Sequence, residues 1–506
     1  VPYAGSSTVV CTVTSQTPSA AANCTDTTVT NGTTYLYKIY TRDSIGNYSV
    51  GVTPAGSPYT PAGPGCYSVA TGNWDSSLTW ASSAGGVPGT CPGTLLILGV
   101  PDSATPVYIN FTTTSHTVTV NIATAAATSV SIGAPGTGTA GLAIGSGTLT
   151  VGGSVTVTGG TGTKKASLTF TTGTLKLGGN LTDSGATVLT WGTGTVEYNG
   201  TGAQTVGAYG YYNLTINKAS GTATTGANIT IGNNLTLTAG TLDIVGYSMD
   251  RGTAGGTVSV VNGATLRIGG GGDFPANYST VSLGATSTVE YYGGIYQLVT
   301  NVTYGHLILG GADRKALGAG TITIAGNLTI NSGSECDANV NDPTVNLAGN
   351  FTNNGTFTAG TSTMVFNGTV AQSIGGGATT FYHLTISNTA GVNAGSSSIG
   401  VTGTFANSGT FNADTSTVTF NGTAAQTITA TATTTFYNLV FNNAAGFTIS
   451  GGNVTASNAL TLTSGVVTTG TNTLIFSPIT SCSVTRTSGY VNGKLRKSFT
   501  STQTAC

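Results

Sequence analysis

The 506-residue chain carries 14 basic and 15 acidic residues, so its net charge is −1 and only 6% of its residues are charged. This balance supplies neither the basic surface that binds nucleic acid nor a polybasic segment for anionic lipid, and no apolar run approaches the length of a membrane span. Glycine occupies 77 positions while Val, Ile, Thr, Tyr and Phe are abundant, which favours folded β-structure over disorder.

The first predicted element is a strand over residues 35–40 (YLYKIY) that runs into a turn over 43–47 (DSIGN). This stretch resembles the later strands of a fibronectin type III-like domain, which implies a partial β-sandwich over residues 1–60. Such a sandwich needs about seven strands. We therefore expect the early strands to come from a longer chain or from another subunit.

Residues 61–145 predict a linker, a disulfide-bearing cap and the first coils of a solenoid. A Pro-rich stretch is followed by Trp74 and Trp80, and then by short strands around Val118 and Val130. Two tryptophans at this place would cover the open apolar end of a first coil. The pattern resembles the entry module of bacterial secreted β-helix repeat proteins.

Four copies of one motif run through residues 146–478. They begin at Thr195, Thr288, Thr363 and Thr417, and the last two read TMVFNGTVAQSI and TVTFNGTAAQTI. The separations of 93, 75 and 54 residues differ, so the coil must be shorter than the repeated module. Aliphatic residues alternate with Thr, Gly marks the corners, and no helical period appears. The fold class predicted is all-β, a parallel β-helix or β-solenoid.

These repeats resemble the β-strand repeats of very large bacterial cell-surface and secreted proteins. The resemblance implies an extracellular or cell-surface location. Residues 479–506 predict a separate basic hairpin module, with the densest positive cluster at 490–497 (YVNGKLRK). This module resembles a segment that closes such β-helix domains in bacterial surface proteins, where further domains normally follow.

Six of the seven cysteines form pairs of short separation near the two ends of the chain. The predicted disulfides join Cys11 with Cys24, Cys66 with Cys91, and Cys482 with Cys506. Local bridges of this kind are typical of an oxidising, extracellular setting. Cys336 is left over, either as a buried inert thiol or as the partner in an intermolecular bridge.

No catalytic constellation can be assembled from these residues. Glu197 and Glu290 hold equivalent places in two copies, where the other copies carry Val and Thr, and His306 and His383 alternate with Asn in the same way. Positions that vary so freely favour a structural role on the outer face of a strand. We therefore expect no enzymatic activity.

An acidic segment is the one candidate metal site. Glu335, Asp337, Asn339 and Asp342, together with Asn341, offer oxygen ligands that suit Ca²⁺, although the spacing and corner Gly of known calcium loops are missing. The alternative is a solvated inserted loop, and no other cofactor is expected. Asn-x-Ser/Thr sequons are candidate glycosylation sites. They include Asn180, Asn213, Asn234, Asn327, Asn350, Asn354, Asn367 and Asn421.

The function expected from the sequence is that of an extracellular structural protein: a self-assembling surface fibre or filament subunit, or an adhesin stalk. Its expected partner is itself, through head-to-tail or lateral contacts, with surface carbohydrate as a second candidate partner. The alternative is a carbohydrate-binding or polysaccharide-degrading β-helix, which the fold permits by analogy alone.

Overall fold

The computed structural model describes residues 36–53, 65–91, 99–110, 115–133, 139–160, 165–185, 187–431, 433–478 and 484–498. It confirms the predicted fold class, because 54% of the chain is strand and the strands form a parallel β-solenoid of about 18 turns. The helical content of these ranges is one 3-10 turn, η1 (Ser77–Thr79), and no helix in them is long enough to cross a membrane. The chain divides into two compact units, residues 1–173 with 182–190, and residues 174–181 with 191–506.

An antiparallel hairpin is formed within residues 36–53. Ile39 exchanges backbone hydrogen bonds with Val52, and the Asp43 carboxylate accepts the backbone N–H of Asn47 at 2.8 Å. A turn therefore lies where the sequence predicts one. The rest of the fibronectin-like sandwich falls largely outside the described residues, so that part of the prediction stays a prediction.

A compact cap opens the solenoid of the first unit. The predicted disulfide between Cys66 and Cys91 is present, and the rings of Trp74 and Trp80 meet edge to face at 5.1 Å. Both tryptophans are buried, and the indole N–H of Trp80 donates to the backbone oxygen of Trp74 at 2.8 Å. Aromatic rings packed edge to face in this way seal the apolar end of a stack. Only the indole N–H of Trp80 has a partner, because that of Trp74 is buried without one.

Three parallel ladders follow the cap in the first unit, and they stack coil on coil. β3 (Trp80–Ala81) pairs antiparallel with β1 (Cys66–Ser68). The strands of the three ladders are β1, β4 (Pro106–Asn110), β7 (Ser129–Gly133), β10 (Val155–Thr158) and β13 (Leu181–Ser184); β2 (Gly72–Asn73), β5 (His116–Val120), β8 (Ala140–Ile144), β11 (Ala166–Phe170) and β14 (Thr187–Thr190); and β6 (Ala125–Ala127) with β9 (Thr148–Val151).

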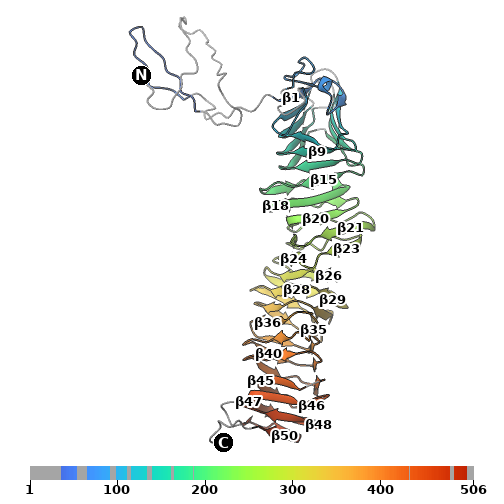
Figure 1. The fold of residues 1–506 in the computed structure, drawn as a ribbon, viewed down its shortest axis with the longest axis vertical. Coiled ribbons are helices and arrows are strands. Elements are labelled where there is room, and N and C mark those ends of the chain that lie inside the picture. The colour runs from blue at the N-terminus through green and yellow to red at the C-terminus, as the bar shows by residue number, and fades with distance from the viewer. Residues whose placement is uncertain are drawn as a thin grey trace. The chain divides into compact units, whose positions relative to one another are not determined.

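The second unit continues as successive coils from β15 to β50, which Figure 1 shows in chain order. We name three of its parallel ladders. Face 1 consists of β22 (Thr265–Ile268), β24 (Thr288–Tyr291), β27 (His306–Leu309), β30 (Leu328–Ile330), β33 (Phe351–Asn353) and β36 (Gln372–Gly376); face 2 of β25 (Gln297–Val299), β28 (Asp313–Leu317), β31 (Ser334–Asp337) and β34 (Thr356–Thr358); and face 3 of β29 (Thr321–Ile324), β32 (Thr344–Leu347), β35 (Thr363–Phe366), β38 (His383–Ile386), β41 (Phe405–Asn407), β44 (Gln426–Ala430) and β46 (Phe447–Ser450).

The remaining strands of the second unit extend these ladders on either side. They include β12 (Thr174–Leu177), β15 (Thr195–Tyr198), β16 (Gln204–Val206), β18 (Asn213–Thr225), β20 (Leu235–Asp243), β21 (Gly255–Val260), β23 (Tyr278–Leu283), β37 (Thr379–Phe381), β40 (Ser398–Val401), β43 (Thr417–Phe420), β45 (Thr434–Asn442), β47 (Val454–Ser464), β48 (Val466–Phe476) and β50 (Tyr490–Lys497). Long strands such as β18 carry a register shift partway along their ladder.

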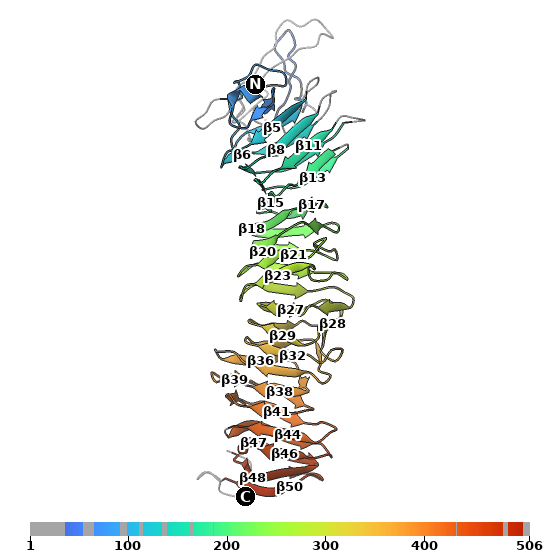
Figure 2. The same cartoon turned by 90° about the vertical axis from the view of Figure 1, so that its right-hand side faces the viewer.

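Each coil is about 20 residues long, since Thr344 lies beside Thr363 and Thr363 beside His383 along face 3, the stack of strands visible in Figure 2. Inward positions are mostly aliphatic or aromatic and almost fully buried, whereas outward positions are mostly Thr, Asn or charged. Burying one side of every strand while pairing its backbone above and below is what makes a Thr-rich, nearly uncharged sequence fold.

Successive copies of the repeated motif start on different faces. The copy that begins at Thr288 places its first strand, β24, on face 1, whereas in the copy from Thr363 the second strand, β36, lies on face 1 and the first, β35, on face 3. The copy from Thr417 places its second strand, β44, on face 3. The copies are therefore not separated by a whole number of coils.

The cap disulfide leads to a first prediction. Replacing Cys66 and Cys91 together by Ser should weaken the cap by about 2–4 kcal/mol, because the bridge restricts the unfolded loop between them. Hydrogen–deuterium exchange should show faster exchange in β1 to β5 and unchanged exchange from β29 onward, which serves as the internal control. Equal protection of the cap in both proteins would contradict this.

Candidate functional site

A buried glutamine follows the corner of each repeat copy. Gln372 is 1% exposed; its Oε1 accepts the backbone N–H of Gly368 at 2.9 Å, and its Nε2 donates to the backbone oxygens of Leu347 and Gly349 in the preceding coil. The same set of bonds is formed by Gln204, Gln297 and Gln426. The amide thus holds its own corner closed and ties it to the coil before, and we call this arrangement the glutamine clamp.

The next coil supplies a further donor to three of these clamps. Asn388 donates to Oε1 of Gln372 at 2.9 Å, and Asn443 donates to that of Gln426 at 3.1 Å. In the first copy the donor is Lys218, whose Nζ lies 2.7 Å from Oε1 of Gln204. Because asparagine and lysine alternate here, the position requires a hydrogen-bond donor rather than a particular charge.

Two lysines are buried in rings of backbone oxygens. Lys218 also donates to the oxygen of Gly200 at 2.6 Å, and Lys315 donates to those of Gly293 and Ala312 at 2.8 and 3.1 Å. Both side chains are almost fully buried, and this burial lowers the pKa of each ammonium. A lysine with a lowered pKa suits a nucleophile. Here, however, the ammonium groups donate their hydrogen bonds to backbone oxygens at the corners of the coils.

Buried tyrosines occur in hydrogen-bonded pairs. The hydroxyls of Tyr198 and Tyr211 lie 2.9 Å apart and those of Tyr291 and Tyr304 lie 3.2 Å apart, and burial raises the pKa of all four. The other two copies carry phenylalanine at both places. These pairs are Phe366 with Phe381 and Phe420 with Phe436. Either both hydroxyls are present or neither is, as expected where an unpaired buried hydroxyl is costly.

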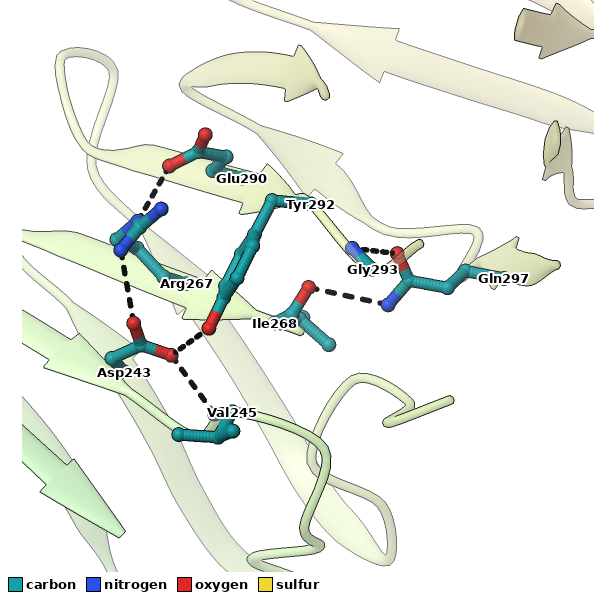
Figure 3. A network of polar contacts seen from close by, with 8 residues as sticks. All are labelled: Asp243, Val245, Arg267, Ile268, Glu290, Tyr292, Gly293 and Gln297. Carbon is teal, nitrogen blue, oxygen red and sulfur yellow. Dashed lines mark hydrogen bonds and ion pairs between the residues drawn. The ribbon is translucent and has the colours of Figure 1, made fainter. Parts of the chain in front are cut away.

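The largest charged network lies at one corner of the second unit (Figure 3). Arg267 bridges two carboxylates, with 2.9 Å from Nη1 to Oδ2 of Asp243 and 2.7 Å from Nε to Oε2 of Glu290. Tyr292 donates to Asp243 at 2.6 Å and places its ring 4.2 Å from the guanidinium carbon. The three charged residues stand side by side on β20, β22 and β24, so the network fixes the register of three coils.

The carboxylate singled out in the first copy is also paired. Glu197 lies 3.2 Å from Nζ of Lys176 on the adjacent strand and accepts a hydrogen bond from Asn217 at 2.9 Å. Glu197 and Glu290 thus each bind a cation one coil away. The structure gives both an inter-coil role and does not bring them together.

The two repeat histidines accept backbone hydrogen bonds from the following coil. Nδ1 of His383 accepts the N–H of Thr404 at 3.1 Å, and Nδ1 of His306 accepts that of Asn327 at 2.9 Å. In the first copy the Oδ1 of Asn213 performs this task. Histidine and asparagine therefore replace each other because each places an acceptor at the same point.

The acidic segment 335–342 does not converge on one point. Asp337 pairs with Arg314 at 2.9 Å, Glu335 accepts a hydrogen bond from Thr358, and Asp342 accepts the N–H of Thr361. Asn341 donates to a backbone oxygen of the preceding coil, while the backbone N–H of Asn339 is bonded to Asp337. Within the described ranges, no group of three or more His, Cys, Asp or Glu side chains is placed to hold a metal ion.

Cys336 points into the core beside this segment. It is free and 0% exposed, and burial together with the neighbouring carboxylates raises the pKa of its thiol. A sulfur in this place is neither a ready nucleophile nor open to a second chain. Of the other predicted disulfides, those of Cys11 with Cys24 and Cys482 with Cys506 lie outside the described residues.

The sequon asparagines fall into two groups. Five of them use their side-chain oxygen to accept a backbone N–H of the next coil: Asn180, Asn213, Asn234, Asn327 and Asn350. Asn354, Asn367 and Asn421 are exposed, and so is Asn350 of the first group. The exposed asparagines are the more accessible to a glycosylating enzyme, and glycosylation stays a prediction.

Sequence reasoning missed the glutamine clamp, the buried lysines and the network around Arg267. The signal for the clamp was present, because Gln is the one long polar residue that all four copies share at the same place. The donor one coil later varies in type and in spacing, so no fixed pattern marks it. Comparison with known proteins adds no further assignment, since no family model, curated protein or solved structure matches this chain.

The glutamine clamp can be tested directly. Changing Gln372 to Leu should destabilise the surrounding coils by about 2–4 kcal/mol, because several buried donors and acceptors lose their partner. Chemical denaturation measures the loss in the free energy of unfolding. Hydrogen–deuterium exchange at the backbone amides of Gly368 and Asn388 measures the local loss of protection. Ser373→Ala on the outer side of the same strand is the control and should change stability little. Matching losses in both variants would refute the clamp.

The His383 position predicts a local pH response. Burial lowers the pKa of His383 from its ordinary value of 6.5, so the folded ring binds its proton less readily than the unfolded one. The bond to Thr404 is therefore intact above pH 6.5 and is lost as the pH falls through the lowered pKa. Amide exchange at Thr404, corrected for its intrinsic pH dependence, should accelerate in acid. His383→Asn should abolish that response, and a persisting response would contradict this account.

Proposed function

We propose that the chain is an extracellular structural protein, the subunit of a self-associating surface fibre or the stalk of an adhesin. The observation that carries this proposal is that the buried polar side chains form their hydrogen bonds and ion pairs within the solenoid. The glutamines, buried lysines, paired tyrosines, histidines and Arg267 network each bond to backbone or to a neighbouring coil. Side chains of the types that an enzyme uses to bind or activate a substrate here stabilise the contacts between coils.

The surface chemistry supports the same proposal. Charged residues make up 6% of the chain and nearly cancel. Four ion pairs join residues on adjacent strands of the solenoid, so these charges are paired within the chain. The pairs are Lys176–Glu197, Arg267–Asp243, Arg267–Glu290 and Arg314–Asp337. A net charge this close to zero leaves little electrostatic repulsion between copies. The cap disulfide is compatible with an oxidising exterior.

Purified protein provides the test. Sedimentation velocity and negative-stain imaging across a concentration series should show concentration-dependent association that persists at high salt, since apolar and hydrogen-bonding contacts drive it. The same preparation should release no new reducing ends from a panel of neutral and acidic polysaccharides. Monodisperse particles at every concentration would overturn the self-associating fibre and leave the adhesin stalk, whereas polysaccharide cleavage would overturn both.

A further inference from the structure

Six Asn-Gly pairs lie in the part of the chain that the structure describes, and this dipeptide is prone to spontaneous deamidation. The backbone nitrogen of the glycine loses its proton and attacks Cγ of the asparagine side chain. The side-chain amide takes up a proton and leaves as ammonia, and water opens the cyclic succinimide to aspartate or isoaspartate. An acceptor that binds the glycine N–H opposes the first step, because it favours the protonated form of the nitrogen.

The glutamine clamp supplies such an acceptor to three of the pairs. The N–H of Gly368 donates to the buried Oε1 of Gln372 at 2.9 Å, and the N–H of Asn367 donates to the backbone oxygen of Leu347 at 3.0 Å. Gly368 is buried while Asn367 is exposed, so the nitrogen faces the interior and the side chain that it would attack lies at the surface. The clamped pairs are Asn199 with Gly200, Asn367 with Gly368, and Asn421 with Gly422.

In two further pairs the glycine nitrogen also has an acceptor. The N–H of Gly263, which follows Asn262, donates to the backbone oxygen of Thr286 at 3.1 Å. The N–H of Gly355, which follows Asn354, donates to a side-chain oxygen at 3.2 Å. Five of the six pairs therefore hold the proton that the reaction must remove.

The sixth pair, Asn492 with Gly493 in β50, differs from the others. Both residues are exposed. Along the ladder with β48, Asn492 lies beside Thr468. The next paired residue, Lys494, lies beside Thr473, so the register shifts at Gly493 and this glycine faces no residue of β48. The ladder is thus interrupted at the nitrogen that the reaction uses.

The charge around the sixth pair favours the reaction and its product. Asp414 is the last acidic residue of the sequence, so residues 415–506 contain basic side chains and no acidic one. The basic residues are Arg486, Lys494, Arg496 and Lys497. Positive charge near the glycine nitrogen stabilises the anion that forms when the proton leaves, and it also stabilises the new carboxylate.

We propose that Asn492 is a site of spontaneous modification to aspartate and isoaspartate, and that the glutamine clamp protects the clamped pairs from the same reaction. This inference is independent of the proposed function. An isoaspartate adds a carbon atom to the backbone, which a corner bonded to the preceding coil cannot accommodate. At Asn492 the register already shifts, so the product is tolerated there.

Incubation of the purified protein in warm, mildly alkaline buffer, followed by peptide mapping with mass spectrometry, tests the site. Asn492 should deamidate at least about tenfold faster than Asn367 and Asn421. Labelling by an isoaspartyl methyltransferase should mark the same peptide, and Asn492→Gln should abolish that label. Equal rates at the three asparagines would overturn the assignment.

The protective role is tested by Gln372→Leu, which removes the acceptor of the Gly368 N–H. Asn367 should then deamidate at least about tenfold faster than in the wild-type protein, whereas Asn421 retains its own clamp and should keep its rate. Asn388→Ala is the matched control, because it loosens the clamp but leaves the acceptor in place. It should accelerate Asn367 much less, and equal acceleration by the two variants would refute protection by the clamp.

Gln426→Leu covers the case in which Q372L fails to fold, because it reverses the two positions. Asn421 should now be the faster site and Asn367 should keep its rate. If both glutamine variants accelerate both asparagines equally, the fold as a whole protects them and the clamp assignment is wrong.

Discussion

The structure depends on one constraint: each coil must find partners for its buried polar groups in the coil before it and the coil after it. Parallel stacking does this for the strand backbone, at a spacing of about 4.8 Å. At the corners the ladder of backbone hydrogen bonds is interrupted, and side chains supply the hydrogen-bond partners there. The glutamine clamp satisfies one N–H and two backbone oxygens at each motif corner, and in three of the four copies a donor from the next coil completes it. Stability is thereby distributed over many neighbouring pairs of coils, as in other repeat proteins.

Much of this was predictable because repetition averages out local ambiguity. Four aligned motifs, alternating Thr and aliphatic residues, and Gly at corners were sufficient for the solenoid, and the short Cys66–Cys91 spacing was sufficient for the cap bridge. The exchange of His with Asn predicted a structural polar position, and the acceptor geometry at Thr404 and Asn327 gives its physical reason. What repeats in sequence is therefore what the coil requires.

The contacts that do not repeat were beyond sequence reasoning. Asp243 and Arg267 lie 24 positions apart, and no rule of spacing joins them until the register of β20 and β22 is known. In the acidic segment, closeness along the chain suggested a Ca²⁺ site, with a solvated loop as the alternative, and the described carboxylates do not converge on one point. Glu335 and Asp337 lie two residues apart on β31 and therefore on the same side of that strand, but Glu335 bonds to Thr358 of the following coil and Asp337 to Arg314 of the preceding one. Asp342 lies in the loop beyond β31 and accepts the N–H of Thr361. Proximity in sequence does not create a ligand cage in a β-coil.

The rotation of the motif from face to face bears on where function can reside. A module equal to a whole number of coils would stack identical side chains into a continuous row on one side. Here successive copies begin on different faces, and their clamps are distributed over more than one face of the second unit. Face 1 is used twice, because β16 of the copy from Thr195 and β36 of the copy from Thr363 both join its ladder. Local departure from the repeat, rather than the repeat itself, is where a specific contact can be encoded.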